Sequence, residues 1–203
     1  MNLRSPTNTV REELIVKKSH FISIATKVSS LDQVKELVAK TKKENPNANH
    51  VVHAAIVGNQ GTIYSYSDDK EPKNTAGRPA FEVLKGSNLT NIVILIIRYF
   101  GGTLLGTGGL VKAYGNSAKQ VLKKITSEEL IKKSEFNLRT SYERFDRIKI
   151  LLEKYDCSIS NEVFEVGVQI KGTVAYINCN NLKNDIIENS NAQDMIEFNE
   201  LPF

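Results

Sequence analysis

The densest group of glycines in the sequence stands directly behind an apolar run. Five glycines occupy the nine positions from 101 to 109, between NIVILIIRY and a helical pattern of apolar residues. Free backbone N–H groups at the start of a helix attract anions, and Arg98 and Lys112 add positive charge nearby. The segment predicts an anion-binding junction; alternatively, its glycines only let the helix cross the strand at close range. These glycines are Gly101, Gly102, Gly106, Gly108 and Gly109.

The spacing of the glycines excludes two common phosphate-binding motifs. A P-loop ends in Gly-Lys-Ser/Thr, but Gly106 is followed by Thr107 and Gly108. A dinucleotide fingerprint that includes Gly106 and Gly108 needs a third glycine at 111, where the chain has Val111. The junction therefore matches neither nucleotide-binding loop.

Three carboxylates lie close together in the polar segment SDDKEP. Asp68, Asp69 and Glu71 are suited to bind Mg²⁺ or to act as acids and bases, although no nucleophile stands at a recognisable spacing. Alternatively, they are surface acids that cap the following helix. Nearby cations extend the candidate anion-binding or nucleic-acid-binding surface, namely Lys70, Lys73 and Arg78.

Aromatic and histidine side chains are further candidates. Five aromatic residues are suited to stack on nucleic-acid bases, or else they belong to the core: Tyr64, Tyr66, Tyr99, Phe100 and Tyr114. His50 and His53 stand three apart in a predicted strand and so face opposite sides of it, which is poor geometry for one metal. We expect neither a metal nor a cofactor.

Charge is distributed unevenly along the 203 residues. Residues 1–133 contain 20 Lys and Arg against 11 Asp and Glu, a balance of +9, whereas residues 134–203 contain 7 against 12, a balance of −5. A basic half is typical of proteins that bind nucleic acid or another polyanion. The alternative is that its lysines only solvate helix surfaces.

The sequence predicts neither export nor a membrane span. The stretch MNLRSPTNTVREEL contains charges and a proline where a secretory signal needs an apolar core, and the longest aliphatic run is residues 92–97. Cys157 and Cys179 show no zinc-binding spacing. We expect a cytoplasmic protein with buried, reduced thiols.

Hydrophobic periodicity predicts the elements that position these residues in the first half. The unbroken apolar run NIVILIIRY predicts a strand buried on both faces, at the centre of a sheet. The other expected elements are a strand over 13–28, a helix capped by Ser30 and ending before Pro46, a hairpin around 58–61, a short helix near 75–86 and a helix over 110–125.

The second half predicts a separate domain, so that the fold class is α+β. The β-α-β-β-α-β order of its elements is that of a ferredoxin-like unit. A boundary within 127–135, where the charge also reverses, gives domains 1–133 and 134–203. The expected elements are a strand over 136–141, a helix over 142–155, strands near 157–163 and 165–174, a short helix from 181 and a strand near 194–198.

The segments SDDKEP, TAGRP and RYFGGTLLGTGGLVKAYG together resemble the YigZ/IMPACT family, and the layout fits over nearly the whole chain. The resemblance implies an N-terminal β-α domain similar to the second domain of a small-subunit ribosomal protein. It implies a C-terminal ferredoxin-like domain similar to the fifth domain of elongation factor G. It also implies a cytoplasmic protein linked to translation, since eukaryotic relatives regulate initiation under amino-acid starvation by binding the activator of a stress kinase.

Charge and resemblance together predict a non-enzymatic, translation-associated regulatory factor. Its basic N-terminal domain would bind RNA, the ribosome or another anionic surface through residues 98–112, and its C-terminal domain a protein. The first alternative is an enzyme that acts on a phosphorylated or other anionic small molecule, with Mg²⁺ at the acidic loop. The second is a pure protein-interaction adaptor.

Overall fold

The computed structural model describes residues 3–200 and divides the chain into two compact units, Met1–Leu130 and Ile131–Phe203. Each unit has its own sheet and its own hydrophobic core. The boundary predicted after residue 133 falls at the start of strand β8, Lys133–Thr140.

A five-stranded antiparallel sheet forms the centre of the first unit, in the order β2-β3-β6-β4-β5. The middle strand is β6, and its residues 92–97 are all buried, which confirms the prediction made from its apolar run. The predicted hairpin is also present as β4 and β5. The bounds are Val10–Val16 for β2, Ser19–Lys27 for β3, His50–Val57 for β4, Ile63–Ser67 for β5 and Ile92–Tyr99 for β6.

The single strand predicted over 13–28 is instead a hairpin of β2 and β3. The chain turns at Lys17 and Lys18, whose φ angles are 44° and 69°. Two consecutive residues in this left-handed region form the tight turn that matches the twist of paired strands. Asn or Gly usually marks such a turn, and two lysines carry no signal of it.

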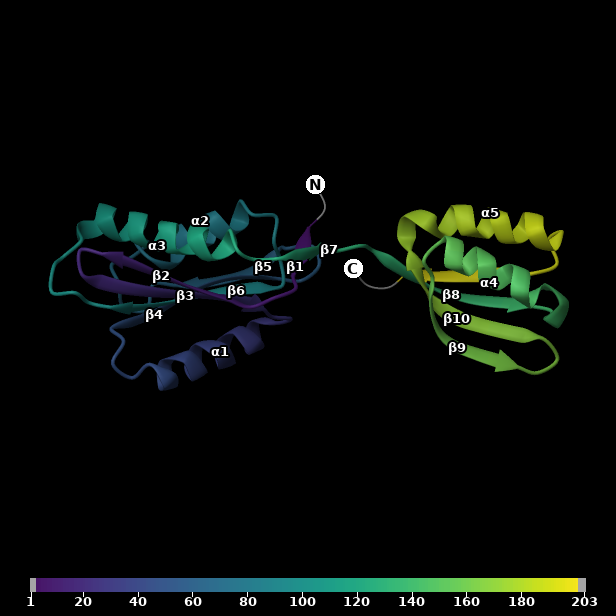
Figure 1. Cartoon of the computed structure of the whole chain (residues 1–203), viewed down its shortest axis with the longest axis horizontal. Coiled ribbons are helices and arrows are strands. Elements are labelled where there is room, and N and C mark those ends of the chain that lie inside the picture. The colour runs from purple at the N-terminus through teal and green to yellow at the C-terminus, as the bar shows by residue number, and fades with distance from the viewer. Residues whose placement is uncertain (1–2, 201–203) are drawn as a thin grey trace. The chain divides into compact units, whose positions relative to one another are not determined.

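Helices cover both faces of this sheet, with α2 and α3 on one face and α1 on the other (Figure 1). Helix α1 begins as predicted, since Ser30 Oγ accepts a hydrogen bond from the Gln33 N–H at 3.2 Å. The bounds are Leu31–Glu44 for α1, Gly77–Lys85 for α2 and Gly106–Leu122 for α3.

Alternate residues of β6 belong to different cores. Ile94 and Ile96 pack with α2 and α3, whereas Val93 and Leu95 pack on the α1 side. Arg98 continues the first series, so its side chain points toward α2 and α3. Strand β6 thus places the buried guanidinium of Arg98 in the layer that contains the acidic loop and the glycine junction.

A small two-stranded sheet completes the first unit. Strand β1 (Arg4–Pro6) pairs antiparallel with β7 (Ser127–Glu129), and Arg4 Nε donates to Ser127 Oγ at 2.9 Å. Neither strand was predicted, because three residues are too few to show a periodic pattern.

The second unit has the predicted β-α-β-β-α-β element order, and its antiparallel sheet has the order β11-β8-β10-β9. Helices α4 and α5 cover one face of that sheet (Figure 1). Likeness to the elongation-factor and ribosomal domains stays a prediction. Besides β8, the bounds are η1 Tyr142–Arg144, α4 Phe145–Lys154, β9 Ser158–Phe164, β10 Val168–Ala175, η2 Tyr176–Asn178, α5 Cys179–Ser190 and β11 Met195–Glu200.

Both cysteines are free thiols. Cys179 is buried and Cys157 is half-buried, and burial together with the nearby Asp156 raises the pKa of Cys157 to about 11. Within residues 3–200, none of the helices has the length and apolar character that crossing a membrane requires.

Candidate functional site

The five glycines of the junction occupy two different structures. Gly101 and Gly102 lie in the loop after β6, whereas Gly106, Gly108 and Gly109 belong to the first turn of α3. The helix therefore begins before the predicted residue 110.

The glycines also differ in what requires them. A Cβ atom on Gly101 would overlap the carbonyl carbon of Lys18, so this glycine allows two backbone segments to approach closely. Gly106 has a φ of 71°, which a side chain disfavours. Gly108 has neither constraint, since a Cβ there would meet no atom within 4 Å. The packing explanation accounts for Gly101 but leaves Gly108 unexplained.

The N-terminus of α3 has no cap from its own sequence. Its N-cap residue is Leu105, which offers no side-chain acceptor, and the first turn contains no acidic residue. Thr107 lies inside the first turn, is exposed and does not cap the helix. The first backbone N–H groups of a helix have no partner within it, so this end of α3 presents unsatisfied donors and a positive dipole end.

The first residue of the acidic loop caps a helix. Asp68 Oδ1 accepts hydrogen bonds from the N–H groups of Ala76 at 3.0 Å and Gly77 at 2.8 Å, at the start of α2. Its Oδ2 accepts from the Asn74 N–H at 2.8 Å. Asp68 is therefore a capping residue, as the alternative interpretation of the acidic loop predicts.

Asp69 ties the acidic loop to β4 and α1. Its Oδ2 accepts from the Val51 N–H at 2.7 Å, its Oδ1 pairs with Lys42, and its carbonyl oxygen accepts from His50 Nδ1 at 2.8 Å. Burial alone raises the pKa of the Asp69 carboxyl. The bonds from Lys42 and Val51 outweigh burial and hold that pKa below its ordinary value.

The third acid belongs to a buried polar cluster. Glu71 is 8% exposed, and its Oε1 pairs with Arg98 and accepts from the Tyr114 hydroxyl at 2.8 Å. Burial, followed by the adjacent carboxylate, raises the pKa of Tyr114, so the phenol stays protonated and donates. We call Glu71, Arg98 and Tyr114 the buried triad.

The triad corrects two sequence predictions. Tyr114 is fully buried and cannot stack on a base, and Arg98 is 5% exposed and cannot contact a polyanion lying on the surface. Tyr99 is half-buried and donates its hydroxyl hydrogen to Asn45 at 2.9 Å. Three members of the predicted stacking set keep a partly exposed ring: Tyr64 is 56% exposed, Phe100 45% and Tyr66 39%.

The carboxylates of the acidic loop do not converge on one point. Asp68 caps α2, Asp69 binds Lys42 and β4, and Glu71 binds Arg98. Within residues 3–200 no group of three or more His, Cys, Asp or Glu is arranged to hold a metal ion. Each of the three acids of the loop is therefore engaged in a separate contact.

A pocket of about 420 Å³ lies between the end of β6 and the start of α3. Arg98, Glu71 and His50 contribute its polar wall, and the start of α3 contributes Gly106 and Thr107. His50 is the register partner of Arg98 across β4 and β6. Sequence reasoning assigned His50 no role here, because strand register is not readable from one sequence. The apolar lining is Pro72, Phe100, Leu104, Leu105 and Leu110.

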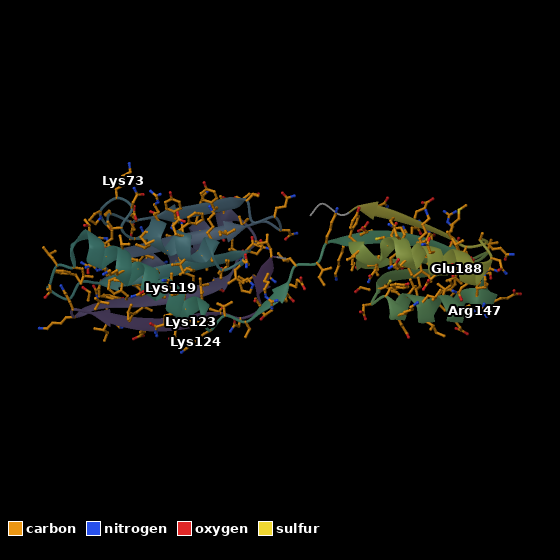
Figure 2. All side chains as sticks on the ribbon, turned by 90° about the horizontal axis from the view of Figure 1, so that it is seen from above. Lys73, Lys119, Lys123, Lys124, Arg147 and Glu188 are labelled. Carbon is orange, nitrogen blue, oxygen red and sulfur yellow. The ribbon has the colours of Figure 1, made fainter. Side chains whose placement is uncertain are left out.

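The other predicted cations gather on the side of the unit formed by α2 and α3. We call the exposed surface of residues 70–85 and 106–124 the α2–α3 face. Within these ranges the only exposed carboxylate is that of Glu82, and Figure 2 labels four of the lysines. The exposed cations are Lys70, Lys73, Arg78, Lys85, Lys112, Lys119, Lys123 and Lys124.

A groove of about 530 Å³ runs between α2 and α3 on this face. Arg78, Lys112 and Lys119 line it, above an apolar floor that includes Pro79 and Val111. The structure therefore brings Arg78 and Lys112 together, whereas Arg98 points into the core below.

Comparison with known proteins decides the family. The Impact N-terminal domain family matches residues 17–122. An IMPACT family member of Haemophilus influenzae is 35% identical over 97% of this chain and 96% of its own length. The chain belongs to the IMPACT family. The IMPACT family member YigZ of Escherichia coli is 36% identical over 80% of both chains, so the predicted YigZ/IMPACT resemblance is confirmed.

A solved structure supports the two-unit α+β fold of this IMPACT-family chain. It is described as the crystal structure of a hypothetical protein, is 28% identical, and is similar over 100% of this chain and 98% of its own, with a TM-score of 0.67. The matched IMPACT domain contains both the pocket and the groove.

Proposed function

We propose that this chain is a cytoplasmic, translation-associated regulatory factor without catalytic activity, and that its first unit binds the phosphate backbone of RNA, free or in the ribosome. The observation that carries the proposal is the charge of the α2–α3 face, where eight exposed cations accompany one exposed carboxylate. Phosphates are recognised by such clusters, because each Lys or Arg that neutralises a phosphate releases bound counterions.

The α1 side of the sheet differs from the α2–α3 face in how its lysines are paired. Three of the four lysines of α1 pair with acids: Lys35 with Asp32 at 2.9 Å, Lys40 with Glu44 at 3.8 Å, and Lys42 with Asp69. On the α2–α3 face, the only pairs found among the described residues are Lys124 with Glu12 and Arg78 with Glu82. The basic balance of the first unit is therefore concentrated on one side.

The proposed contact differs from the one predicted from sequence. Arg98 is buried, so the junction at 98–112 offers Lys112 but not Arg98 to a surface ligand. We place the contact along the groove of α2 and α3, with Lys70 and Lys73 at its edge. The charge of −5 over residues 134–203 favours a protein partner for the second unit, since that unit would be repelled by RNA. The link to translation rests on the IMPACT-family resemblance.

The test is co-sedimentation of the full chain with ribosomes and with free RNA across a salt series. We expect the logarithm of the binding constant to fall linearly with the logarithm of salt concentration. The Lys112→Ala/Lys119→Ala variant should bind more weakly to all RNA sequences, with the slope reduced by roughly 2.

Lys40→Ala/Lys43→Ala is the matched control. It also removes two exposed helical lysines, but from α1 on the other side of the sheet. An equal loss in both variants would show only a net-charge effect, and no binding of the wild type at low salt would refute the proposal.

A further inference from the structure

We propose that the pocket beside the glycine junction binds a small organic phosphate, with the phosphate at the N-terminus of α3 and an apolar body against Phe100 and the adjacent leucines. The pocket holds about 420 Å³, which lies within the range of small-molecule sites. This inference does not depend on RNA binding by the α2–α3 face.

The first observation concerns the end of α3. Gly106, Thr107 and Gly108 form its first turn, all three are exposed, and neither a side-chain cap nor an acidic residue neutralises them. Gly108 has open space where a Cβ would stand and no unusual φ, so neither packing nor backbone geometry requires a glycine there. A bare first turn keeps its N–H donors accessible to an anion.

The second observation is independent and concerns Arg98, which lines the same pocket. Its side chain is more than nine-tenths buried, and its Nε–H has no hydrogen-bond partner among the described residues. Glu71 neutralises one side of the guanidinium through Nη1. A buried N–H without an acceptor is costly, and because Arg98 lines the pocket, a ligand that brings an acceptor to this N–H would remove that cost.

The third observation is the composition of the remaining wall. Leu104 is 83% exposed and Phe100 is 45% exposed, although both border the pocket. An apolar group seated there would cover them, at a gain of about 25 cal/mol for each Å² removed from water. Positive backbone at one end and exposed apolar side chains at the other fit one amphipathic anion better than inorganic phosphate.

The probe is phenyl phosphate, titrated into the ¹⁵N-labelled full chain and followed by NMR. We expect saturable shifts of the amide signals of Gly106, Thr107 and Gly108. Inorganic phosphate should shift the same amides at higher concentrations. Phenol should shift none of them; equal shifts with phenol would overturn the inference, as would shifts that are absent or confined to the α2–α3 groove.

Gly108→Asp is the decisive variant. Its side chain enters open space, and a carboxylate in the first turn stabilises a helix, so the variant should fold with an unchanged or higher melting temperature. The same carboxylate repels an anion, and we expect phenyl phosphate binding to weaken by about tenfold or more.

Two controls separate the local effect of the carboxylate at position 108 from the effect of side-chain size and from the effect of the protein's net charge. Gly108→Asn should keep binding, because it adds a neutral side chain of nearly the same shape. Gly115→Asp adds the same charge in the same helix, where a Cβ also meets open space, but it borders the groove. Retained phenyl phosphate binding with weakened RNA binding in Gly115→Asp would separate the two sites. Loss of phenyl phosphate in Gly115→Asp but not in Gly108→Asp would refute the pocket.

Discussion

The Tyr114 hydroxyl lies 2.8 Å from Glu71 Oε1, and this hydrogen bond joins α3 to an acidic loop 43 residues earlier in the chain. Both side chains are buried. Arg98 completes the contact from β6, so that one carboxylate holds the loop, the central strand and the long helix together. A buried carboxylate is tolerated only when it is paired and hydrogen-bonded, and the two donors meet both requirements.

Tyr114→Phe tests the neutral donor of the triad. The variant keeps the ring, including its edge-on contact with Phe21, and removes one hydrogen bond to a charged acceptor. We expect the free energy of unfolding of the first unit to fall by about 1.5–3 kcal/mol. Hydrogen exchange of the slowest amides in β6 measures it for this unit alone. Tyr99→Phe, which loses a bond to the neutral Asn45, should cost less; an equal cost would show that the charge of Glu71 is unimportant.

A double-mutant cycle tests the ion pair. Glu71→Gln leaves the Arg98 guanidinium buried without a counter-charge, and we expect a loss of about 3–5 kcal/mol. Arg98→Met likewise leaves the Glu71 carboxylate buried without a counter-charge. In Glu71→Gln/Arg98→Met neither charge remains, so the loss should be smaller than the sum of the single losses by roughly 2 kcal/mol, by the same hydrogen-exchange measurement. Additive losses would contradict a direct pair.

The elements that the sequence predicts best are those whose pattern repeats. The apolar run of β6 spans a whole strand, and the amphipathic repeat of α1 stands between Ser30 and Pro46. The turn at Lys17 and Lys18 was missed because its conformation comes from the pairing of β2 and β3, and lysine does not favour it.

The candidate site was predictable as a set of residue types but not as an arrangement. Arg98 and Lys112 carry the same charge and stand 14 positions apart, and on sequence alone they have the same predicted role. Because successive side chains of a strand point to opposite faces, the Arg98 side chain lies in the core. Lys112 lies on the exposed side of α3. The partners of Glu71 come from β6 and α3, and only the packing of a helix on the sheet brings them together.

Two alanine substitutions test which of the glycines is required for packing. Gly101→Ala places its Cβ inside van der Waals contact with the Lys18 carbonyl group, which is backbone and cannot move aside cheaply. We expect the first unit to lose about 1–3 kcal/mol or more. Gly108→Ala meets open space in a helix and should gain about 0.5–1 kcal/mol, because alanine is the better helix former. Thermal melts of both variants decide the point, and destabilisation by Gly108→Ala would mean that packing requires that glycine too.

Acid should weaken the link between the acidic loop and α1. The pKa of Asp69 is lowered in the folded chain, so the folded state binds this proton less readily than the unfolded state does. The resulting stabilisation is present at pH above the ordinary value of 3.8 and is lost as the pH falls through the lowered folded-state pKa. Asp69→Asn keeps an acceptor for the Val51 N–H but loses the attraction to Lys42.

The difference in urea midpoint between the wild type and Asp69→Asn should therefore be largest near neutral pH and shrink as the pH falls toward and below 3.8. It should be modest even at neutral pH, because Lys42 is 47% exposed and water screens the pair. Lys42→Ala should reproduce most of this pH-dependent part, since it removes the same attraction from the other side. A midpoint difference that stays constant into acid would assign the role of Asp69 to its backbone hydrogen bond and not to its charge.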